Sequence, residues 1–212
     1  MWATERAICA AAFLWAAVLL TAQFVRALRG RQPDLSVAAG SGGRGALYNV
    51  TVAMSPSHKE TARRHPVAFG AGVLLHAGIA VAVIRVCAVL IAPGAPPLFG
   101  IPGMVFSGVT ALTGLSLLAR RAASPALRVL SSPDDYVAAA LTTAFLAAGA
   151  ARDAGLVPVG VYVLAAAAFA LYLPLGKLRH VLFCPVSRLE LGARLGRRGT
   201  FPPAREVKDV GE

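Results

Sequence analysis

Charged residues are scarce in this chain. Only 15% of its 212 residues are Asp, Glu, Lys or Arg, whereas an ordinary soluble domain has about 25%. Hydrophobic residues make up 57% of the sequence, and the mean hydropathy is +0.65. This composition excludes an ordinary soluble domain and predicts an integral membrane protein.

The chain also lacks the residue clusters that most chemistry requires. It has three cysteines, with no paired spacing for zinc or an iron–sulfur cluster and no Cys-x-x-Cys-His motif, so any haem is expected to be non-covalent. Cys9 and Cys87 are expected to be packing residues rather than a disulfide. No apolar segment holds the grouped Glu, Asp, His or nucleophile of a stand-alone enzyme. Internal repeats and paired broken helices, which are typical of transporters, are absent from the sequence.

Five apolar segments are long enough to approach or exceed the span of a bilayer core of about 30 Å. Between them lie Gly, Pro and Ser loops and one longer connection, so no soluble domain of independent size is expected. The fold class predicted is an all-α bundle of five transmembrane helices, occupying residues 1–190, followed by a basic tail at 191–212. The segments are Ala7–Val25, Pro66–Ala92, Leu98–Ala119, Tyr136–Ala151, which is short, and Leu156–Phe183.

The positive charges predict the orientation of these helices. All but three of the 21 Lys and Arg residues fall in the loops, at the end of the fifth segment or in the tail, on one side of the five-span arrangement; the exceptions are Arg6, Arg85 and Arg152. Positive loops face the cytoplasm, so the N-terminus is expected outside and the C-terminus inside. The net charge of +11 is then a topology signal and an attraction to anionic lipid, and nucleic-acid binding is not expected.

Only two of the four histidines, His76 and His180, lie within apolar segments. Imidazoles are costly in lipid unless they have a function, and two of them on different helices can ligate one haem iron from opposite faces. We therefore predict one haem b with His76 and His180 as axial ligands. His65 lies eleven residues before His76 on nearly the same helix face. A second haem lacks a facing ligand, so His65 is interpreted as an interfacial residue, with a quinone or proton path as the weaker alternative.

A glycine precedes each of these histidines by one helical turn: Gly72 before His76, and Gly176 before His180. A missing side chain at that position would leave room for a flat porphyrin against the backbone. The competing interpretation is that both glycines serve helix packing, which is common in membrane helices.

Basic residues near the expected cytoplasmic end of the site are candidates for contact with the haem propionates. Each of them is equally explained as an ordinary charge flanking a span on the inner side. The candidates are Lys177, Arg179, Arg63 and Arg64.

Several short motifs, in the order of these segments, are similar to those of a known family. They are LHAGI at 75–79, SPDDY at 132–136, and PLGKLRH at 174–180 followed by Cys184 and Pro185. With the five-span layout, they resemble the respiratory nitrate reductase gamma-subunit family over about residues 5–190. Its relatives include the membrane cytochrome b subunits of heterodisulfide-reductase-like and sulfite-reduction-linked complexes.

This resemblance implies an electron-transfer subunit that is not catalytic alone, in a bacterial or archaeal cytoplasmic membrane. It would pass electrons between menaquinol or ubiquinol and a cytoplasmic iron–sulfur subunit, with His76 and His180 matching the ligands of the haem nearer the cytoplasm. The two further histidines of diheme members correspond here to Val86 and Tyr162. The outer haem is therefore expected to be missing. The alternative function is a non-redox five-helix membrane scaffold or small transporter.

Two other polar groups need a structural explanation. Arg85 lies nine residues after His76, on roughly the opposite face of the same helix, and is expected to snorkel outward or pair with Asp153. The segment Asp134–Tyr136 is interpreted as the cap and interfacial anchor of the fourth helix, with a proton relay as the weaker alternative.

Overall fold

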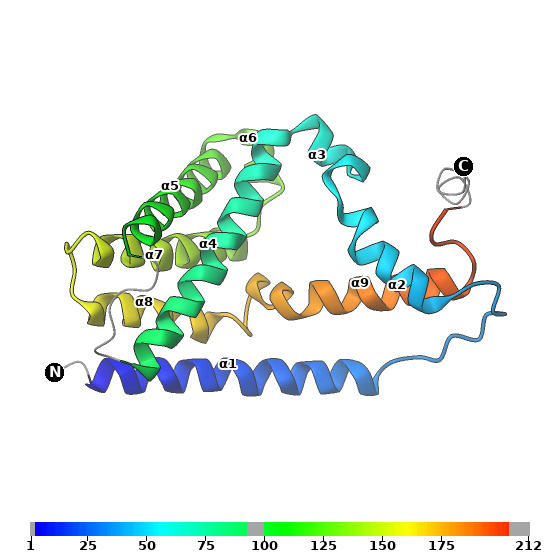
Figure 1. Cartoon of the computed structure of the whole chain (residues 1–212), viewed down its shortest axis with the longest axis horizontal. Coiled ribbons are helices and arrows are strands. Elements are labelled where there is room, and N and C mark those ends of the chain that lie inside the picture. The colour runs from blue at the N-terminus through cyan, green and yellow to red at the C-terminus, as the bar shows by residue number, and fades with distance from the viewer. Residues whose placement is uncertain (1–2, 93–99, 204–212) are drawn as a thin grey trace. The chain divides into compact units, whose positions relative to one another are not determined.

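A computed structural model describes residues 3–92 and 100–203, and within these residues the chain forms helices and no strands (Figure 1). Three short 3₁₀ turns, η1 (Val52–Met54), η2 (Pro56–His58) and η3 (Lys177–Arg179), connect longer elements. The α-helices are α1 (Ala3–Arg29), α2 (Gly42–Val50), α3 (Glu60–Arg64), α4 (Pro66–Ile91), α5 (Gly100–Ala123), α6 (Pro125–Val129), α7 (Pro133–Asp153), α8 (Val159–Tyr172) and α9 (His180–Arg197).

Three of these helices, α1, α4 and α5, are long and apolar enough to cross a membrane. The number becomes four if α8 and the helical residues that follow it form one broken span. Many of their large apolar side chains are exposed, among them Ile84 on α4 and Leu112 on α5, as expected of helices that contact lipid. The all-helical membrane class is thus supported, whereas the count of five spans and the orientation of the termini are not confirmed.

The fifth expected helix, Leu156–Phe183, is not continuous. Helix α8 ends at Tyr172, and α-helix resumes only at His180, after η3. Pro174 explains the break, because proline has no N–H for the helical ladder and its ring clashes with the carbonyl four residues earlier. At 14 residues and about 1.5 Å per residue, α8 alone is about 21 Å long, shorter than a bilayer core.

The chain divides into two compact units. Unit 1 contains the described residues of 1–21 and 70–179, and unit 2 those of 22–69 and 180–212. The predicted boundary at residue 190 falls inside α9 and stays a prediction.

The core of unit 1 is built on aromatic rings and close helix contacts. Phe145 of α7 stacks on Tyr162 and Phe169 of α8, with ring centroids 5.6 and 5.1 Å apart. Gly78 of α4 lies against the side chain of Thr110 on α5, so near that a Cβ would collide with it. Small residues let membrane helices approach closely, and this contact fixes α4 against α5.

Unit 2 is organised around the pair of α2 and α9, which lie side by side (Figure 1). Gly45 of α2 meets Gly192 and Gly196 of α9 backbone to backbone, without space for a Cβ. The buried Asn49 amide donates a 2.6 Å hydrogen bond to the Arg188 carbonyl oxygen. Asn49 begins an Asn-Val-Thr sequon, but its side chain is only 1% exposed.

Candidate functional site

His76 lies on α4, on an exposed face of unit 1. Its Nδ1 is 2.7 Å from the carbonyl oxygen of Gly72, one turn earlier. A carbonyl oxygen only accepts, so Nδ1 carries the proton in this hydrogen bond, and in the neutral imidazole the lone pair is on Nε2. Metal-ligating histidines also donate their second ring N–H to a carbonyl or carboxylate.

The two glycines expected to clear a porphyrin differ in their surroundings. A Cβ at Gly72 would meet nothing within 4 Å, so the helix surface beside His76 is open there. A Cβ at Gly176 would collide with the phenol ring of Tyr172. The surface beside His76 is thus open, while at Gly176 a tyrosine occupies the space that the sequence argument assigned to the porphyrin.

His180 is the exposed first residue of α9 and belongs to unit 2. His76 belongs to unit 1. The two histidines thus lie in different units, and their pairing on one iron stays a prediction.

Lys177, a candidate for propionate contact, is engaged with the start of α7. Its Nζ lies 2.5 Å from Asp135 Oδ2, and its backbone N–H donates to Asp134 Oδ2 at 2.9 Å. Asp135 also accepts from the Ser132 N–H at 2.8 Å. The bond from Lys177, followed by the one from Ser132, lowers the pKa of Asp135 to about 2. The predicted role of this segment as the helix cap is confirmed.

The other basic candidates for propionate contact lie at the ends of short helices. Arg64 pairs with Glu60 at 2.6 Å on the surface of unit 2, and Arg63 is exposed beside it. His65 ends α3, is exposed, and separates that helix from α4. Arg179 is exposed at the end of η3 in unit 1. The structure therefore places Arg63, Arg64 and His65 in unit 2, and Lys177 and Arg179 in unit 1.

A buried ion pair in unit 1 joins Arg85 of α4 to Asp153 at the end of α7. Only 3% and 4% of the two side chains are exposed. Arg85 Nη1 also donates a 2.6 Å hydrogen bond to Ser107 Oγ on α5, and Ser107 in turn donates to the Gly103 carbonyl oxygen at 2.8 Å. The predicted pairing of Arg85 with Asp153 is confirmed. The guanidinium ties three helices together.

Two atoms of this ion pair, Arg85 Nε and Asp153 Oδ2, are buried without a hydrogen-bond partner among the described residues. Burying an ionic group costs on the order of several kcal/mol per ion. That cost is offset fully only when every polar atom of the group has a hydrogen-bond partner. The pair is therefore a site where removing one partner is expected to be expensive. The role of Ser107 was not recognised from the sequence, where a lone serine in an apolar helix carries no distinguishing signal.

Val86 and Tyr162, which correspond to the outer haem ligands of the diheme relatives, lie in the core of unit 1. They are 0% and 1% exposed. The Tyr162 hydroxyl donates a 2.7 Å hydrogen bond to the Ala82 carbonyl oxygen, and the guanidinium of Arg152 lies 5.5 Å from the ring centroid. Both positions are thus occupied by packed side chains. All three cysteines are free thiols.

No family model, curated protein or solved structure matches this chain. The resemblance to the nitrate reductase gamma subunits consequently rests on the short motifs alone.

Proposed function

We propose that this protein is a membrane cytochrome b subunit that binds one non-covalent haem b and carries electrons between the quinone pool and a cytoplasmic iron–sulfur partner. The observation that carries the proposal is the hydrogen bond from His76 Nδ1 to the Gly72 carbonyl oxygen. It orients Nε2 as a metal ligand on an apolar helix, beside a glycine whose surroundings are open. A haem bound there supplies one-electron redox chemistry.

The second axial ligand in this proposal is His180. It requires five spans, with the N-terminus outside and the C-terminus in the cytoplasm, so that both histidines reach the inner half of the bilayer. The side chains of Arg179 and Arg63 would then be available to the haem propionates, whereas Arg64 would first have to leave Glu60, and Lys177 would have to leave Asp135. Packed Val86 and Tyr162 support a single haem, because neither position offers a ligand or space.

The charge of the C-terminal region supports the proposed partner. Helix α9 carries Arg188, Arg194 and Arg197, and further basic residues follow it. An acidic docking face on a partner would suit these arginines. Association should then weaken as salt rises, since the Debye length is about 10 Å at 0.1 M.

The alternative is a non-redox membrane scaffold or small transporter. It is favoured by the tyrosine ring that covers Gly176, and by the buried ion pair of Arg85 and Asp153, because intramembrane charges often mark transport pathways. A transporter would use this pair in the mechanism, whereas a cytochrome would use it only to hold the helices together.

A reduced-minus-oxidised optical spectrum of the purified chain separates the two functions. The cytochrome predicts a haem b band that is lost in His76→Ala and in His180→Ala and retained in the matched control His58→Ala. A quinol analogue should reduce the haem, with reoxidation only when the cytoplasmic partner is added. Absence of the band from the intact protein would leave the non-redox function as the better explanation.

A further inference from the structure

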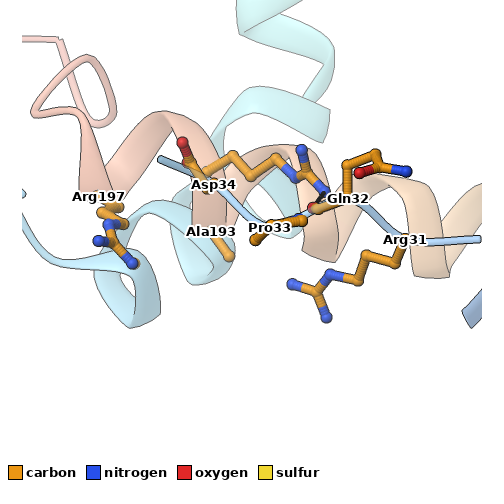
Figure 2. A pocket seen from close by; sticks show the side chains of 8 residues that line it. Arg31, Gln32, Pro33, Asp34, Ala193 and Arg197 are labelled. Atoms are coloured by element: carbon orange, nitrogen blue, oxygen red, sulfur yellow. Dashed lines mark hydrogen bonds between the residues drawn. The ribbon is translucent and has the colours of Figure 1, made fainter. Parts of the chain in front are cut away.

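Unit 2 contains a pocket of about 490 Å³ between the chain that leaves α1 and the helix α9 (Figure 2). Three arginines line it, Arg31, Arg194 and Arg197, together with Asp34 and with Gly42, the first residue of α2. The Arg31–Asp34 segment is held in place by a 3.0 Å hydrogen bond from Arg194 Nη2 to the Gln32 carbonyl oxygen. The pocket is therefore built from interacting elements rather than from isolated surface arginines.

The pocket and its immediate surroundings carry more positive than negative charge. Glu190 accepts from both Arg31, at 2.8 Å, and Arg194, at 2.6 Å. Asp34 pairs with Arg198 at 3.1 Å. Four guanidinium groups thus face two carboxylates. The hydrogen bonds from Ser36, followed by the one from Arg198, hold the pKa of Asp34 below its usual range. Asp34 is therefore ionised throughout the neutral pH range.

The N-terminus of α2 adds to the positive potential. Gly42 lies at the pocket as the first residue of that nine-residue helix, which begins after the cap residue Ser41. The unsatisfied N–H groups and the dipole of a helix favour an anion at this end. Arginines beside it offer paired N–H donors that match the oxygens of a phosphate group.

In a membrane that α1 crosses, the pocket would lie at the depth of lipid headgroups. Helix α1 is a candidate membrane span that ends at Arg29, and the Arg31 N–H still donates to the Leu28 carbonyl oxygen at 3.2 Å. The headgroup layers extend about 5 to 8 Å beyond each side of the hydrocarbon core, which is one or two helical turns. Arg31 therefore emerges from the span at headgroup level.

Two exposed apolar side chains flank the same segment. Leu35 is 90% exposed and Val37 87% exposed, while the alternating residues Asp34 and Ser36 bond to arginines of the α9 region. A cationic site beside exposed aliphatic side chains is the composition of a surface that inserts into the boundary between headgroups and acyl chains. This feature distinguishes a lipid from a soluble phosphate.

We propose that this pocket binds the phosphate group of an anionic phospholipid, held by Arg31, Arg194 and Arg197 at the α2 N-terminus, with Leu35 and Val37 against the acyl chains. The site lies outside the residues assigned to haem. It would anchor the segment after α1 and the end of α9 to the same face of the membrane.

The test uses the full chain in a neutral detergent, titrated with short-chain phosphatidylglycerol, with short-chain phosphatidylcholine and with inorganic phosphate. Native mass spectrometry counts the bound molecules. The site variant is Arg31→Gln with Arg197→Gln, which spares Arg194 and its contact with Gln32. Arg128→Gln with Arg120→Gln removes the same charge from unit 1 and is the matched control.

We expect phosphatidylglycerol to bind more tightly than phosphatidylcholine, and the site variant to weaken its binding about tenfold or more while the control retains it. A third variant, Arg197→Lys, keeps the charge and loses the paired donors, so it should show a smaller loss. Far-UV circular dichroism verifies that each variant is folded. Equal binding of both lipids, equal losses in the site and control variants, or binding of inorganic phosphate as tight as that of phosphatidylglycerol would each overturn the assignment.

Discussion

Replacing Asp153 with Asn tests whether the buried ion pair holds unit 1 together. The change keeps the size of the side chain but leaves the Arg85 guanidinium, 3% exposed, without a countercharge. Breaking a buried pair by removing one partner costs about 3–5 kcal/mol. The Asn carbonyl can still accept one hydrogen bond from Arg85, so we expect about 3 kcal/mol for Asp153→Asn and about 5 kcal/mol for Asp153→Ala.

The double variant Arg85→Met with Asp153→Leu supplies the diagnostic comparison. Replacing both charges by apolar groups of similar volume is often neutral or stabilising. Ser107 would lose Arg85 but keep its own donor bond to the Gly103 carbonyl oxygen. We therefore expect the double variant to be within about 1 kcal/mol of the unmodified chain, far more stable than either single variant.

The free energy of unfolding would be measured by titrating the chain in mixed micelles with an anionic denaturing detergent and following the loss of helix by circular dichroism. Glu60→Gln is the matched control, because it breaks the exposed Arg64–Glu60 pair, with side chains 72% and 68% exposed; exposed pairs contribute at most about 1 kcal/mol. If Asp153→Asn lowers the free energy of unfolding no more than this control, or if the double variant is as unstable as the single one, the buried pair does not hold unit 1 together.

Two further predictions concern local contacts. Gly72→Leu should abolish the haem band in the optical spectrum while α4 remains inserted, since a side chain at that position meets only open space. Gly78→Leu should instead disrupt unit 1 itself, because the new side chain would collide with that of Thr110. Gel filtration would then show loss of the folded species. Lys177→Met should raise the pKa of Asp135 from about 2 towards its ordinary value of about 3.9, measured by carboxyl NMR titration. Because this pKa is depressed in the folded state, the stabilisation is present above about pH 4 and lost as pH falls through about 2, and the variant should lack that acid transition.

The pairing of Arg85 with Asp153 could be predicted because the cost of a charge in an apolar span limits the options. A buried guanidinium needs a carboxylate at its own depth, and Asp153 closely follows the predicted fourth segment, Tyr136–Ala151. The helix cap at Asp135 could also be predicted, since Ser-Pro-Asp-Asp before an apolar run is a local signal of a helix N-terminus. Both inferences depend on few residues and on simple energetic rules.

The break after Tyr172 was missed because apolar composition was given more weight than backbone chemistry. Leu156–Phe183 has enough apolar residues for a span, yet Pro174 removes a helical hydrogen bond and Gly176 follows it with low helix propensity. The proline was visible and could have located the break. The contact of the Tyr172 ring with Gly176 could not be predicted, since it depends on the path of the chain after the helix ends.

Helix α4 presents two polar residues in opposite directions, and the buried one determines the position of the other. Nine residues separate His76 from Arg85, which is about 13.5 Å along the helix and half a turn in angle. Arg85 points into the core, where Ser107 and Asp153 fix the rotation of the helix, and His76 therefore lies on the outward face. An apolar helix without such a pair is free to rotate in lipid, since all its faces suit the solvent equally well. The charge buried in unit 1 thus specifies the direction in which α4 offers its imidazole.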